Sequence, residues 1–112
     1  MFPSVNRLRN EKDIKTLFAK GRSVFDVTLG IRFAPNNLPM TRFTVVVGTK
    51  ISKRAVVRNR LKRRIRGIVE KRLLEIKPGF DVLFLVKKET IDQTHKQLVE
   101  QIERMFKRAK LV

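Results

Sequence analysis

The sequence predicts an α+β fold, a two-layer sandwich in which helices pack on a mixed β-sheet. Three observations lead to this prediction. Apolar residues alternate with polar ones around residue 30, they recur at helical spacing in three other segments, and a strand, a helix and a strand follow one another in the second half. The 112 residues, 42% of them apolar, suit a single domain over 1–112 with a modest core.

The first predicted element is a short helix over residues 11–20. Asn10 and Asp13 resemble an N-terminal capping box, and Gly21 offers a stop. Between them, apolar residues recur at helical spacing, namely Ile14, Leu17 and Phe18.

Two strands are predicted next. Segment 25–33 alternates strictly, which predicts a half-buried strand with apolar positions at Phe25, Val27, Leu29, Ile31 and Phe33. Turn-forming residues at 35–39 separate it from a second apolar strand over 43–48. An antiparallel hairpin between these two strands is the simplest connection.

A central helix is predicted over 52–76, where an apolar stripe runs until Pro78 and Gly79 follow. The apolar run 82–86 then predicts a strand that is covered on both faces and lies beside 43–48, which makes the helix a crossover. A last helix has its apolar face at Leu98, Ile102, Met105, Phe106 and Ala109. The predicted order is helix, strand, strand, an optional further strand, helix, strand, helix.

The charge of the chain predicts a polyanionic partner. It has 27 Lys and Arg against 10 Asp and Glu, a formal net charge of +17, whereas solubility alone is served by charges of about 2 to 8. The longest apolar run, 82–86, is far short of the roughly 20 residues that span a bilayer, so no membrane partner is expected. The absence of cysteine and of an apolar signal core at the N-terminus suits the cytoplasm.

The positive charge is concentrated on the predicted central helix and just before it. Residues 50–66 include nine basic residues and no acidic one. Like charges four residues apart cost an isolated helix a few tenths of a kcal/mol per pair, and their repetition favours a bound anion over a solvated face, which usually mixes both signs. Arginine predominates, as in sites that grip phosphates or stack on unpaired bases. The candidate RNA-binding residues are Lys50, Lys53, Arg54, Arg58, Asn59, Arg60, Lys62, Arg63 and Arg66.

The run from Arg58 to Arg66 resembles the signature of the bacterial ribonuclease P protein component, in which Arg-Asn-Arg is followed by Ile or Leu, Lys and Arg. The match extends from Val47 to Arg66 in the family's spacing, and Asn6, Arg7 and Leu8 also fit. The resemblance implies a fold like domain 2 of ribosomal protein S5. It also implies a protein cofactor that binds the catalytic ribonuclease P RNA and the 5′ leader of precursor tRNA. The RNA performs the phosphodiester hydrolysis with Mg²⁺ that the RNA mainly holds.

The family's leader cleft lies between the first helix and the sheet face. The resemblance places the matching residues at Ile14, Phe18, Gly30 and Arg32, bordered by Lys62 and Arg66. An aromatic such as Phe18 on an amphipathic helix is more often part of a core than a platform for a base, and both interpretations stay open. Arg32 stands where relatives commonly have an aromatic residue, so leader contacts are expected to be more electrostatic than stacked. Gly67 replaces an acidic residue of the family, which suggests a kink or close packing there.

Two other functions are weighed against this one. A self-sufficient nuclease needs a general base or metal-binding carboxylates, but the basic helix has none before Glu70, and His95 has no nearby Ser or Cys. Asp26 and Asp81 could help to position hydrated Mg²⁺, yet no catalytic residue and no protein metal site is assigned. A structural RNA-binding protein of ribosomal type is the remaining alternative. The oligomeric state stays open.

Overall fold

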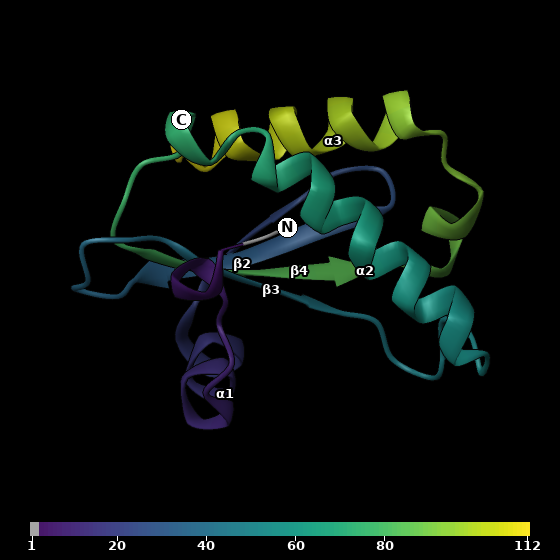
Figure 1. Cartoon of the computed structure of the whole chain (residues 1–112), viewed down its shortest axis with the longest axis horizontal. Coiled ribbons are helices and arrows are strands. Elements are labelled where there is room, and N and C mark those ends of the chain that lie inside the picture. The colour runs from purple at the N-terminus through teal and green to yellow at the C-terminus, as the bar shows by residue number, and fades with distance from the viewer. Residues whose placement is uncertain (1–2) are drawn as a thin grey trace.

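The computed structural model describes residues 3–112 and shows a four-stranded mixed sheet with helices on both faces (Figure 1). The helices are α1 (Glu11–Lys20), α2 (Ala55–Glu70) and α3 (His95–Arg108). The strands are β1 (Arg22–Phe25), β2 (Leu29–Pro35), β3 (Arg42–Val46) and β4 (Phe80–Val86), and short 3-10 turns lie at Ser4–Asn6, Leu73–Glu75 and Lys88–Asp92. The α+β prediction, the mixed sheet and the crossover helix are confirmed. Among the described residues, no helix is long and apolar enough to cross a membrane.

The strand order is β1-β2-β4-β3, and it corrects the predicted hairpin. β2 and β3 do not pair, because β4 lies between them, antiparallel to β2 and parallel to β3. The parallel neighbours β3 and β4 are connected through α2, as the sequence predicted. The physical reason is burial: Val82, Leu83 and Phe84 are completely inaccessible to solvent, and only a central strand is covered in this way.

The single strand predicted over 25–33 is also wrong, because the chain reverses inside it. β1 and β2 form an antiparallel hairpin with the pair Phe25 and Gly30 nearest its turn. Leu29, Ile31 and Phe33 are buried as expected, whereas Phe25 and Val27 are 49% and 70% exposed. The alternation hid the turn because apolar residues continue through it.

Two contacts with α3 hold this turn. The carboxylate of Asp26 accepts hydrogen bonds from Arg104 Nε and Nη2 at 2.9 and 2.8 Å. Beneath it, the buried Gln101 accepts from Thr28 N at 2.9 Å and donates to Thr28 Oγ1 at 3.1 Å. The turn is therefore set by tertiary contacts that lie more than seventy residues away in sequence.

The main core lies between the sheet and the layer formed by α2 and α3. The rings of Phe43, Phe84 and Phe106 meet there with centroids 6.0 to 6.5 Å apart. α1 covers part of the opposite face (Figure 1). Leu8, Leu17 and Leu83 form a smaller cluster there. One sheet face is thus closed by two helices, and the other is only partly closed by one.

The predicted central helix is shorter than expected. α2 starts at Ala55 and ends at Glu70, after which a 3-10 turn occupies Leu73–Glu75. The expectation of close packing at Gly67 is wrong, because a Cβ built there would have no atom within 4 Å apart from its chain neighbours and the nearby backbone of α2 itself, and α2 continues through this residue.

Candidate nucleic-acid interface

The basic face of α2 is built as its sequence pattern predicted. Leu61, Ile65, Ile68 and Val69 are buried against the core, and this leaves the other side of the helix in solvent. Asn59, Lys62, Arg63 and Arg66 line one shallow hollow there, together with the exposed Val56. The first turn of α2 has no acidic residue and no capping side chain, so the positive end of the helix dipole adds to the same potential. The structure thus brings four of the nine candidate RNA-binding residues together.

The other five candidates are arranged differently. Lys50, Lys53 and Arg54 lie in the exposed segment before α2, and Arg60 is an exposed residue on the helix. Arg58 is half-buried, and its Nη1 donates to the carbonyl of Ser52 at 2.9 Å, so it also fixes the segment that leads into α2.

On the face covered by α1, side chains form three rows across the strands. The first row contains Ala34, Asp81 and Arg42, and the second contains Ser23, Arg32, Leu83 and Thr44. The third, which we call the floor row, contains Phe25, Gly30, Leu85 and Val46. α1 lies over the first two rows, through Leu17 against Leu83 and an ion pair from Asp13 to Arg42. The floor row is left less covered, with Phe25 49% and Val46 36% exposed.

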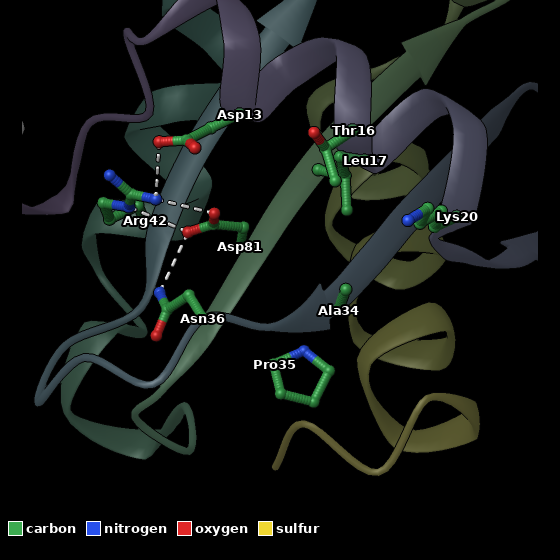
Figure 2. Close-up of a pocket in the computed structure, with 9 residues that line it drawn as sticks. All are labelled: Asp13, Thr16, Leu17, Lys20, Ala34, Pro35, Asn36, Arg42 and Asp81. Carbon is green, nitrogen blue, oxygen red and sulfur yellow. Dashed lines mark hydrogen bonds and ion pairs between the residues drawn. The ribbon is translucent and has the colours of Figure 1, made fainter.

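An ion-pair network fastens the start of α1 to the first row, as Figure 2 shows. Arg42 Nε and Nη2 donate to the two oxygens of Asp81 at 2.8 and 2.7 Å, and Nη2 also reaches Asp13 of α1 at 3.3 Å. Asn36 Nδ2 donates to Asp81 Oδ1 at 2.9 Å. The hydrogen bonds to Asp81 raise the pKa of Arg42 above its usual value. This network engages Asp81, one of the two carboxylates that the sequence analysis considered for positioning Mg²⁺.

Arg32 fastens the other end of α1. Its Nε donates to the carbonyl of Leu17 at 3.2 Å, Nη2 to the carbonyl of Gly21 at 3.0 Å, and Nη1 to Ser23 Oγ at 3.0 Å. These carbonyls lie at the C-terminal end of α1: that of Leu17 also accepts from Gly21 N at 2.9 Å, and that of Gly21 belongs to the C-cap residue. Arg32 is therefore a clamp between helix and sheet, and the sequence analysis missed this role.

The remaining predicted cleft residues fall into two groups. Ile14 is partly buried against the Leu17 cluster, while Phe18 is 43% exposed and so lies outside the core. Gly30 is buried, since the ring of Phe25 covers it. Lys62 and Arg66 lie on α2, which packs on the other face of the sheet and contacts β3. In the described residues, neither side chain forms a hydrogen bond or an ion pair with α1.

The described residues contain no group of three or more His, Asp and Glu that could hold a metal ion. Asp26 is engaged by Arg104, whose hydrogen bonds lower the pKa of that carboxyl. His95 is exposed at the first position of α3.

Comparison with known proteins agrees with this geometry over nearly the whole chain. The family model of ribonuclease P matches residues 2–110. The ribonuclease P protein component of Synechocystis is 32% identical over 111 residues, which cover 98% of this chain and 90% of that protein. The ribonuclease P protein of Thermotoga maritima superposes with a TM-score of 0.82 at 28% identity, over 91% of this chain and 96% of that one. The protein from Staphylococcus aureus gives 0.85 at 25% identity, over 95% and 96%. The chain therefore belongs to the ribonuclease P protein family, the protein components of the endoribonuclease ribonuclease P.

Proposed function

We propose that this ribonuclease P protein uses two surfaces, one for the ribonuclease P RNA and one for the 5′ leader of precursor tRNA. The basic face of α2 serves the RNA subunit, with Asn59, Arg63 and the residues around them. The partly open sheet face beside α1 serves the leader. The division follows from the different character of the surfaces: the first is a charged hollow and the second is an apolar row with charged surroundings.

The observation that carries the leader site is the floor row. Four strands spaced by about 4.8 Å make a row roughly 14 Å long, which α1 covers less than the other two rows. Phe18 is an exposed residue of α1, the helix on this side of the sheet, and Phe25 and Val46 lie at the two ends of the row. A basic protein that exposes aromatic and apolar side chains on an open sheet face suits a single strand, whose bases stack while cations hold its backbone. Lys62 and Arg66 would border this site from α2, beyond the β3 edge.

The chemistry is assigned to the RNA. Both carboxylates that could have positioned Mg²⁺ are ion-paired with arginine, Asp26 with Arg104 and Asp81 with Arg42. We therefore leave the Mg²⁺ of the holoenzyme mainly to the RNA and assign no catalytic residue to the protein. We place the activity in the cytoplasm, in keeping with a chain of this sequence that has no cysteine.

The test is reconstitution with a bacterial ribonuclease P RNA at low Mg²⁺. The protein is expected to stimulate cleavage of precursor tRNA, to give no cleavage alone, and to raise the affinity for precursor tRNA more than for mature tRNA. Arg63→Ala is expected to weaken binding of the RNA subunit without changing the preference for the leader. A protein that binds the RNA but neither stimulates cleavage nor distinguishes the two tRNAs would instead be a structural RNA-binding protein.

A further inference from the structure

The ring of Phe25 packs over Gly30, in space that the side chain of any other residue at position 30 would occupy. Phe25 and Gly30 are directly opposite each other in the β1–β2 hairpin. A Cβ built on Gly30 would lie 2.3 Å from Cδ1 and 2.5 Å from Cε1 of the Phe25 ring. Any side chain at position 30 would therefore push the ring away from the sheet. With glycine there, the ring lies against the strand and is still 49% exposed.

Arg32, which was expected to contact the leader, is already engaged in hydrogen bonds within the protein. Arg32 lies beside Gly30 in the next row, and all three of its guanidinium nitrogens donate to protein oxygens at 3.0 to 3.2 Å. Its task is to hold the C-terminal turn of α1, so it is a positioning residue. The structure therefore gives Arg32 a structural role, and the expected electrostatic contact with the leader stays a prediction.

We propose that Phe25 stacks on an unpaired base of the leader, and that Gly30 leaves the space in which the ring lies. This inference rests on the proposed leader site and adds a residue that the sequence resemblance does not place in it. Charge complementarity supports an RNA strand as the occupant. Arg108 is 56% exposed and donates through Nη1 to the carbonyl of Phe25 at 2.6 Å, so a guanidinium group lies next to the Phe25 backbone. An exposed ring with a partly exposed guanidinium group at its backbone matches the requirements of a base and its phosphate.

The experiment compares Phe25→Ala, Phe25→Tyr and Val27→Ala in the reconstituted holoenzyme. Val27 is the matched control, because it is more exposed than Phe25 and lies in the same turn, where it lines a hollow with α3. Dissociation constants are measured for precursor and mature tRNA, and a leader with 2-aminopurine at successive positions reports stacking by fluorescence quenching. Phe25→Ala is expected to weaken precursor binding by about 5-fold or more and to relieve quenching at one position, whereas Phe25→Tyr and Val27→Ala keep wild-type values.

The role of Gly30 is tested by Gly30→Ala, alone and combined with Phe25→Ala. The single substitution is expected to weaken precursor binding, whereas the double variant is expected to bind precursor tRNA as Phe25→Ala does. Circular dichroism checks that both variants fold. If the wild-type holoenzyme does not prefer precursor tRNA, the proposed function fails. If it does, but Phe25→Ala changes precursor binding less than 2-fold, or no more than Val27→Ala, the stacking role of Phe25 is wrong.

Discussion

Replacing Arg42 by methionine tests how α1 is held on the sheet. In the network of Figure 2, the Asp81 side chain is only 11% exposed and receives two hydrogen bonds from Arg42 and one from Asn36. Arg42→Met keeps the aliphatic volume but removes the guanidinium. Asp81 would then be a nearly buried carboxylate with one remaining donor, and Asp13 would lose its link to the sheet.

The expected loss of unfolding free energy is about 3 kcal/mol, the low end for breaking a buried ion pair, because the Arg42 side chain is still 20% exposed. That is a large share of the roughly 5 to 15 kcal/mol by which a domain of this kind is stable. The double variant Arg42→Met with Asp81→Leu should recover most of the loss, since no buried charge remains. Asn36 Nδ2 keeps its bond to the carbonyl of Met40 at 3.1 Å in that variant.

Urea unfolding followed by far-ultraviolet circular dichroism measures both changes, because the chain has no Trp or Tyr to serve as a fluorescence probe. With an m value of about 1.5 kcal/mol per molar urea, Arg42→Met lowers the midpoint by roughly 2 M. Arg63→Met, on the exposed face of α2, is the matched control and should change stability by less than about 0.5 kcal/mol. A loss below about 1 kcal/mol for Arg42→Met, or a double variant less stable than the single one, would refute the account of a buried pair.

Three further predictions concern other parts of the molecule. Gly67→Ala adds a methyl group in open space within α2 and should raise stability by about 0.5 to 1 kcal/mol, or roughly 4 °C in a thermal melt; a decrease would reveal a contact at this site. Arg104 lowers the pKa of Asp26, so this carboxylate stabilises the fold above its ordinary pKa, and that contribution is lost as the pH falls through the lowered value. Asp26→Asn should therefore melt below wild type at neutral pH and converge with it in acid, and a constant difference would contradict the ion-pair account. The affinity for RNA should fall with a log–log salt slope of about 0.7 to 0.9 per phosphate contact, and Arg63→Ala should reduce that slope by about one contact, whereas an unchanged slope would remove Arg63 from the interface.

Local signals in the sequence were reliable for the helices. The side chain of Asn10 accepts from the N–H groups of Lys12 and Asp13 and so caps α1, as its position predicted. At α3, Thr94 and Gln97 form a complete capping box that the sequence analysis did not single out. The two-sided pattern of α2 likewise placed its basic face correctly, because helix periodicity depends only on neighbours within two turns.

Strand pairing was not predictable in the same way, because it depends on distant segments. The hairpin proposed from the turn residues at 35–39 failed since β4, some forty residues further on, takes the place beside β2. The signal was present in the continuous apolar run 82–86, which indicates a strand with neighbours on both sides. The roles of Arg32 and Phe25 depend on the turn between β1 and β2. Contacts of Asp26 and Thr28 with the distant helix α3 hold this turn. The local alternation of apolar and polar residues therefore could not predict either role.

The strand order also determines when the protein can fold during its synthesis. β4 is the last strand to be made, yet both β2 and β3 pair only with it on their inner edges. A nascent chain that ends before Phe80 can form helices and the β1–β2 hairpin, but it has no central strand on which to assemble a sheet. Its buried residues on β3 and α2 then lack their partners on β4 and α3 until the ribosome has released the C-terminal third of the chain. Folding of this protein is therefore a late event, and the basic segment of α2 is synthesised before the sheet can assemble.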